Sequence, residues 1–139
     1  MRIIAGIWVA VLMVIMASCT GTKKTMDTDI EAIRFGNGGG VTGAADIFIL
    51  KRDGTLAKED REQQQESVKT IDKKTTASLF EKAGLIKDYR YHKPGNMYSF
   101  IELVKPSGNN NITWGIPVGV DSAVIRLYKE LSLLSRIAE

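Results

Sequence analysis

Cysteine and histidine are almost missing from this sequence of 139 residues, which contains one of each, Cys19 and His92. A single cysteine excludes an intramolecular disulfide, and one histidine without a second cysteine excludes the usual zinc ligand sets. His92 could serve as a general base only beside a nucleophile, and neither G-x-S-x-G nor S-x-x-K occurs. We therefore predict no catalytic residue, no metal site and no cofactor, which favours a protein that is not an enzyme.

An excess of charge of either sign is also missing. The chain has 19 Lys and Arg against 16 Asp and Glu, a formal net charge of +3. No basic cluster is interleaved with aromatic residues, and no repeat of solenoid length occurs. This balance gives no electrostatic basis for binding nucleic acid or a membrane surface, so we expect no nucleic-acid partner.

What the sequence does have is an export signal at its start. Arg2 precedes the uncharged apolar run Ile3–Met16, and the small residues Ala17 and Ser18 follow directly before Cys19. A basic start, an apolar run and small residues at the cut are typical of a secretory signal. The run is shorter than the roughly 20 residues that span a bilayer comfortably. An uncleaved membrane helix and a plain secreted protein are the alternatives.

The same residues resemble the lipobox of bacterial lipoproteins, with Met16 where that family prefers Leu. In size and pattern the chain also resembles small bacterial lipoproteins of α+β type that have no named activity. The resemblance implies cleavage before Cys19, a diacylglyceryl thioether on its sulfur, and acylation (palmitate, for example) of the new N-terminus. The lipid bilayer is then a partner through Cys19, the location is the bacterial cell envelope, and Thr20 implies the outer membrane.

The remaining chain divides into a tether and one domain. After the signal at residues 1–18, residues 19–28 are polar, rich in small side chains and without an apolar period, which predicts a flexible tether. Removal of Arg2 with the signal leaves a net charge of +2. Residues 29–139 are long enough for a single domain with its own core.

Strand patterns open this domain. Residues 29–35 and Ala45–Lys51 predict strands, and the second is apolar on both faces and therefore central. Asp53-Gly54 predicts a hairpin turn that returns residues 55–59 antiparallel. The polar run 58–67 is typical of a solvated loop or of a long exposed edge.

Two aspartates mark the starts of two helices. Asp72 predicts the N-cap of a helix over residues 73–83 that stops at Gly84. Asp121 predicts the cap of a helix over residues 122–138. The strands expected between the helices cover residues 97–105 and 112–118. The predicted fold class is α+β, with an antiparallel sheet of about four to six strands in the order ββαββα and two helices packed on one face.

A glycine-rich segment in the first half matches a nucleotide fingerprint. Gly38, Gly40 and Gly43 fit G-x-G-x-x-G, but this motif works between a strand and a helix, and a strand pattern follows Gly43. We therefore expect no nucleotide. The segment is longer than a turn requires, and its amides make it a candidate ligand-binding loop. The candidate residues are Gly36, Asn37, Gly38, Gly39, Gly40, Thr42 and Gly43.

Aromatic residues provide a second candidate surface. Tyr89 and Tyr91 alternate onto one face of an extended segment, and we expect them to be exposed and available for binding. Phe100 and Trp114 fit the core better. These features favour a non-enzymatic binding module for an envelope protein or a cell-wall component. The alternative is a small envelope hydrolase whose site the sequence does not reveal.

Overall fold

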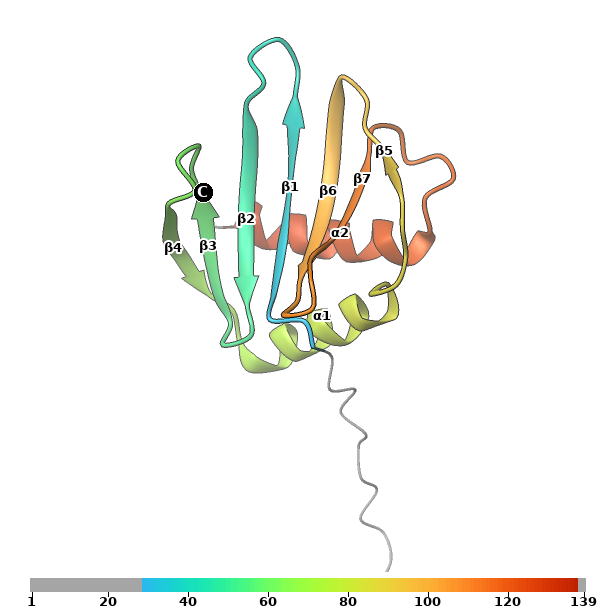
Figure 1. Ribbon diagram of the computed structural model, residues 1–139. Coiled ribbons are helices and arrows are strands. Elements are labelled where there is room, and N and C mark those ends of the chain that lie inside the picture. The colour runs from blue at the N-terminus through green and yellow to red at the C-terminus, as the bar shows by residue number, and fades with distance from the viewer. Residues whose placement is uncertain (1–28, 138–139) are drawn as a thin grey trace, which may run out of the picture.

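The computed structural model describes residues 29–137, which form a seven-stranded sheet and two helices (Figure 1). Residues 1–28, with the expected signal, tether and Cys19, lie outside the described residues, as do residues 138–139. The strands are β1 Ala32–Gly39, β2 Ala45–Lys51, β3 Thr55–Glu59, β4 Gln65–Thr70, β5 His92–Lys93, β6 Met97–Val104 and β7 Asn110–Trp114. The helices are α1 Lys73–Leu85 and α2 Ser122–Arg136.

The mixed α+β class is confirmed, but the number and order of strands are corrected. The sheet has seven strands rather than about four to six, and the order ββββαβββα replaces ββαββα. β4 and β5 account for much of the difference. β4 is mostly polar and is exposed except at the half-buried Lys69, and β5 has two residues. Neither strand has the alternating apolar pattern from which strands are predicted.

β1 lies at the centre of the sheet, whose order is β4-β3-β2-β1-β6-β7-β5. It pairs antiparallel with β2 on one side and with β6 on the other. The pairing of β5 with β7 is parallel, and the other neighbours are antiparallel. Because antiparallel neighbours alternate in direction, the loops gather at two opposite ends of the sheet (Figure 1).

Both helices cover the same face of the sheet, and the core lies between the two layers (Figure 1). On β1, the buried side chains of Ile33 and Phe35 point to the helices, and Arg34 between them points to the other face. From α2, Val124, Leu127 and Leu131 enter the same cluster, which confirms the predicted apolar face of this helix. Alternate residues of β1 and residues three to four positions apart on α2 therefore pack into one core.

Both predicted helix caps are confirmed. The Asp72 carboxylate accepts a hydrogen bond from the Thr75 N–H at 2.9 Å, and the Asp121 carboxylate accepts one from Ala123 at 2.7 Å. The expected stop at Gly84 is wrong, because α1 continues to Leu85 and Gly84 is a buried helical residue without a positive φ. In the described part of the chain, neither helix is long and apolar enough to cross a membrane.

β4 forms one edge of the sheet and contains a bulge. Ser67 and Lys69 pair with consecutive residues of β3, so Val68 is the extra residue. A bulge and charged side chains keep a free edge from pairing with another chain, and Glu66 and Lys69 supply such charges. The polar run 58–67 thus becomes the end of β3, a turn and the start of an exposed edge strand.

The packing of α2 predicts that alanine substitution lowers stability very differently at two leucines that are two positions apart. Leu131 is 0% exposed and Leu133 is 56% exposed. Leu131→Ala should lower the free energy of unfolding by about 2–5 kcal/mol, because it leaves a cavity in the core. Leu133→Ala should change it by less than about 0.5 kcal/mol. Chemical denaturation followed by circular dichroism measures both, and equal losses would contradict this packing.

The N-cap of α1 predicts a pH-dependent contribution to stability. Hydrogen bonds from the Thr75 side chain and amide hold the pKa of Asp72 below its usual range. The charged carboxylate therefore stabilises the fold above its unfolded pKa, near pH 4, and this contribution is lost as the pH falls through the folded pKa. Asp72→Asn keeps a capping group without the charge.

The native protein should accordingly be more stable than Asp72→Asn at about pH 6, and this advantage should shrink as the pH falls below the unfolded pKa and through the lowered folded pKa of Asp72. Urea denaturation of both proteins across this range measures the difference. A difference that does not change with pH would show that the charge of Asp72 has no part in the cap.

Candidate functional site

Four connections lie at one end of the sheet. One is the polar and charged β3–β4 turn, residues 60–64, next to the edge strand β4 (Figure 1). The other three connect β1 to β2, β5 to β6, and β7 to α2. Because β2, β1, β6, β7 and β5 are neighbours in the sheet, these loops form a row (Figure 1). The chain enters β1 at the opposite end (Figure 1). We call this row the rim and define it as residues 39–45, 94–97 and 115–120.

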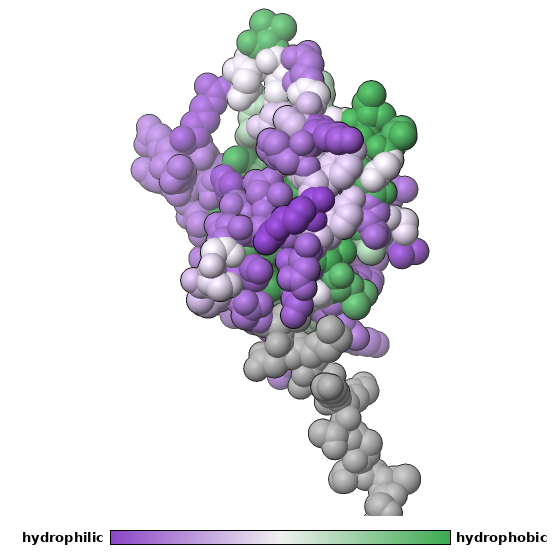
Figure 2. All heavy atoms as spheres, turned by 45° about the vertical axis from the view of Figure 1, so that its right-hand side comes forward, coloured by the Kyte–Doolittle hydropathy of each residue, from purple (hydrophilic) through white to green (hydrophobic). Residues whose placement is uncertain are grey.

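The rim is apolar and carries no Asp, Glu, Lys or Arg, although 25% of the chain is charged. Four large apolar side chains project from it: Val41 is 106% exposed, Met97 61%, Ile116 74% and Val118 79%. Figure 2 shows hydrophobic atoms at the top of the molecule and on its upper right side, above a largely polar surface. Apolar side chains exposed together are typical of an interaction surface.

The candidate glycine loop is shorter than expected. β1 continues past its predicted end at Phe35 and reaches Gly39. The candidate residues that belong to the strand are Gly36, Asn37, Gly38 and Gly39. Their backbone pairs with β2 and β6, and this pairing does not depend on side chains that favour strands. Gly36 also lies close to the neighbouring strand, because a Cβ there would collide with the Asp46 carbonyl oxygen.

Gly40, Thr42 and Gly43 form the loop itself, with Val41 beside them. Gly40 and Gly43 have positive φ angles of 79° and 59°, which glycine adopts at little cost. A strand begins at Ala45, as predicted, and pairs antiparallel with β1. The glycines therefore connect the two strands of a hairpin.

Backbone hydrogen bonds join the loops of the rim to one another. The Gly40 N–H donates to the Asn96 carbonyl oxygen at 2.8 Å, and the Gly115 N–H donates at 2.9 Å to the carbonyl oxygen of Lys93, the last residue of β5 before the rim. Gly115 also lies against Gly95, where an added Cβ would be 2.8 Å from the Gly95 Cα. The rim is therefore a connected surface rather than three independent loops.

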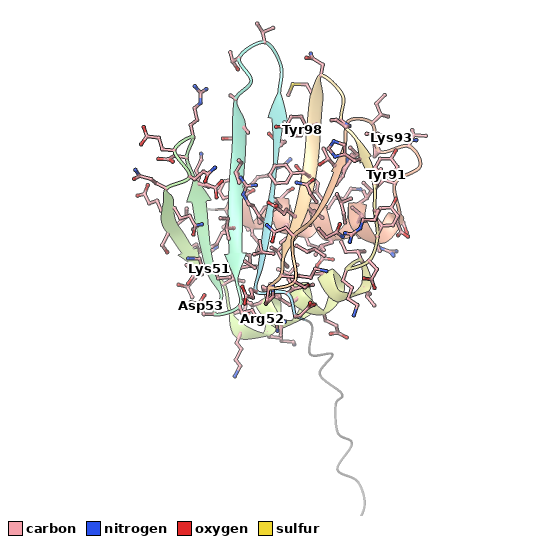
Figure 3. All side chains as sticks on the ribbon, in the orientation of Figure 1. Lys51, Arg52, Asp53, Tyr91, Lys93 and Tyr98 are labelled. Carbon is pink, nitrogen blue, oxygen red and sulfur yellow. The ribbon has the colours of Figure 1, made fainter. Side chains whose placement is uncertain are left out.

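Tyr89 and Tyr91 position the loop between β7 and α2. Their rings stack with centroids 6.3 Å apart, and both are half-buried against the core rather than freely exposed as expected. The Tyr89 hydroxyl accepts a hydrogen bond from the Asp121 N–H, and the Tyr91 hydroxyl donates one to the Val118 carbonyl oxygen, both at 3.1 Å. Figure 3 shows Tyr91 and Lys93 close together beside β5, with the Lys93 Nζ 5.5 Å from the ring centroid.

The sheet face away from the helices carries a network of charges centred on Arg34. Its guanidinium forms ion pairs with Glu59 on β3 and with Glu102 on β6, at 2.5 and 2.9 Å, and lies 5.7 Å from the centroid of the Phe100 ring. Burial alone would lower the pKa of Arg34, but the hydrogen bonds and charges of the two glutamates outweigh it and raise the pKa. The network links strands that are distant in sequence.

An open groove of ≈ 380 Å³ adjoins this network, between the β1–β2 loop and the β3–β4 turn. Its carboxylates already have partners. Glu59 pairs with Arg34, and Asp60 accepts the backbone N–H groups of Glu62 and Gln64, each at 2.9 Å. These contacts explain the carboxylates of the groove as parts of a cross-strand network and a turn.

His92 is exposed on the edge strand β5. Within residues 29–137, no three side chains of His, Cys, Asp or Glu gather in a group that could hold a metal ion.

The sequence matches no protein-family model, and no curated protein is significantly similar to it. The interpretation of the rim therefore depends on its own residues, of which the sequence prediction does not include Val41, Met97, Ile116 and Val118. The last two were expected in a strand over residues 112–118, but β7 ends at Trp114. The glycines and the proline around them could have indicated a loop.

The hydrogen bond from Asp121 to Tyr89 predicts a local change in dynamics. Tyr89→Phe removes the acceptor of the Asp121 N–H. The Asp121 amide should then exchange with solvent about fivefold faster, because a hydrogen bond contributes about 1 kcal/mol. Tyr128→Phe is the matched control, since its hydroxyl donates to the Gly36 carbonyl oxygen instead. NMR-detected hydrogen exchange measures both variants, and an unchanged Asp121 rate in Tyr89→Phe would contradict the positioning role.

Proposed function

We propose that this protein is a lipid-anchored, non-enzymatic binding module of the bacterial cell envelope, and that it holds its partner through the rim. The observation that carries the proposal is the row of exposed apolar side chains, without charges, at the end of the sheet opposite the start of β1. Acylated Cys19 attaches the protein to the bilayer. The outer membrane is the expected location because Thr20 follows the cysteine.

The end at which the chain enters the domain favours a rim that faces away from the membrane (Figure 1). The ten residues from Cys19 to Thr28 span at most about 35 Å. The eight residues of β1 are about 27 Å long. A domain attached at one end of its sheet therefore carries the rim up to about 60 Å from the membrane surface.

The chemistry of the rim favours an envelope protein over a cell-wall glycan. Burial of a large apolar side chain contributes about 1.5–3 kcal/mol before the costs of association are counted. No charged group of the rim has to lose its water when the rim is covered. A glycan would offer mainly hydroxyl and amide groups. The side chains of Val41, Ile116 and Val118 have no donor or acceptor with which to bind them.

The small-hydrolase alternative receives less support. A hydrolase requires polar groups that converge on a substrate with free hydrogen-bonding capacity. In the described part of the chain, Glu59 and Asp60 beside the groove are already bound to Arg34 and to turn amides. His92 lies exposed on β5.

The proposal predicts that membrane attachment and partner binding can be lost separately. Cys19→Ser should release the protein from membranes or leave it unprocessed, because the acylated sulfur is removed. Val41→Asp combined with Ile116→Asp should keep membrane attachment but lose the partner, because the contact would then bury two charges. Cross-linking of intact cells, followed by membrane fractionation and immunoblotting, measures both effects.

Leu133→Asp is the matched control, because Leu133 is exposed on α2 outside the rim. It should change neither attachment nor cross-linked complexes. Complexes that persist in the double variant would contradict binding through the rim. Unmodified Cys19 in membrane-bound protein, detected by mass spectrometry, would contradict the anchor.

A further inference from the structure

The rim is long in one direction and narrow in the other. It follows the ends of the neighbouring strands β2, β1, β6, β7 and β5. At about 4.8 Å between strands, this row is about 20 Å long. Figure 1 shows the β1–β2 hairpin and the start of β6 extending beyond both helices, so this part of the rim is a single sheet layer thick. An edge of this shape fits a cleft better than a flat surface.

Two backbone N–H groups at the tip of the β1–β2 hairpin require hydrogen-bond acceptors when the rim is covered. Within residues 29–137, the N–H groups of Val41 and Thr42 donate to no protein acceptor. A bilayer interior offers no acceptor for such groups, whereas a protein surface does. The rim itself has no Lys or Arg, and Arg61 in the neighbouring β3–β4 turn lies between Asp60 and Glu62, so this end offers no basic cluster to attract anionic lipid headgroups. Both features favour a protein partner over a membrane.

The rim is also held in shape in the absence of a partner. Hydrogen bonds from Gly40 to Asn96 and from Gly115 to Lys93 fix the loops to one another, and Tyr91 fixes the loop at Val118. Loops that are already ordered lose less conformational freedom on binding. Such surfaces typically enter a preformed site with little backbone movement.

We propose that the rim enters an elongated apolar cleft on a folded envelope protein, edge first, with Val41 deepest and Ile116 and Val118 along one shoulder. This inference rests on the proposed function and adds the shape and chemistry of the partner. The cleft is about 20 Å long, has no charged floor, and presents carbonyl or amide oxygens to the N–H groups of Val41 and Thr42. A cleft that the rim occupies is closed to other ligands.

Site-specific photo-cross-linking in intact cells tests this arrangement in the full-length chain. A benzophenone amino acid replaces Val41, Ile116 or, as the control, Leu133, all of which are exposed. The variants at Val41 and Ile116 should cross-link to the same protein several-fold more strongly than the variant at Leu133. Peptide mapping by mass spectrometry should place the partner's cross-linked residues inside one cleft, with the Val41 contacts deeper.

The outcomes separate this inference from the proposed function. Cross-links to one protein that map to a flat or charged surface would overturn the cleft and leave the binding module standing. Cross-links only to lipid or to a second copy of this chain would overturn both the cleft and the proposed protein partner. Cross-links no stronger at Val41 and Ile116 than at Leu133 would also overturn both. Thermal unfolding of each variant, unchanged from the native protein, verifies that these results report on contact rather than on folding.

Discussion

The pairing of β1 with strands on both of its edges is the constraint on which the rest of the structure depends. It places the first strand of the domain at the centre of the sheet, so that alternate side chains enter the core and the others face away from the helices. Arg34 can then reach Glu59 on one side and Glu102 on the other. The same pairing continues through residues 36–39, where side chains contribute little, and supports the hairpin that projects beyond the helices.

The rim differs in its chemistry from other turns of the molecule. In those turns, aspartates order the backbone: Asp53, labelled in Figure 3, accepts the Thr55 N–H at 2.9 Å, Asp60 accepts the N–H groups of Glu62 and Gln64, and Asp72 accepts the Thr75 N–H. At the rim, glycine, proline and backbone contacts shape the loops without a charge. Polar turns would connect the same strands equally well. The fold alone therefore does not account for the apolar composition of the rim.

Features that depend on neighbouring residues could be predicted from the sequence, whereas those that depend on strand order could not. Asp72 and Asp121 are readable as caps because an N-cap needs only one side chain and the next few amides. The extension of β1 through residues 36–39 depends on β6, which lies far along the chain. The glycines around residue 40 indicate a candidate loop by themselves, but Met97 and Val118 join it only through the order of the strands. The rim could not be assembled without the fold.

The bulge at Val68 affects how closely copies of the molecule can lie side by side on one surface. Under the proposed lipid anchor, copies of this protein meet one another at high local density, and open strand edges are the places where sheets of separate molecules fuse. The extra residue twists the edge, and the charges of Glu66 and Lys69 accompany it. Neighbouring copies can therefore crowd together without growing into a continuous sheet.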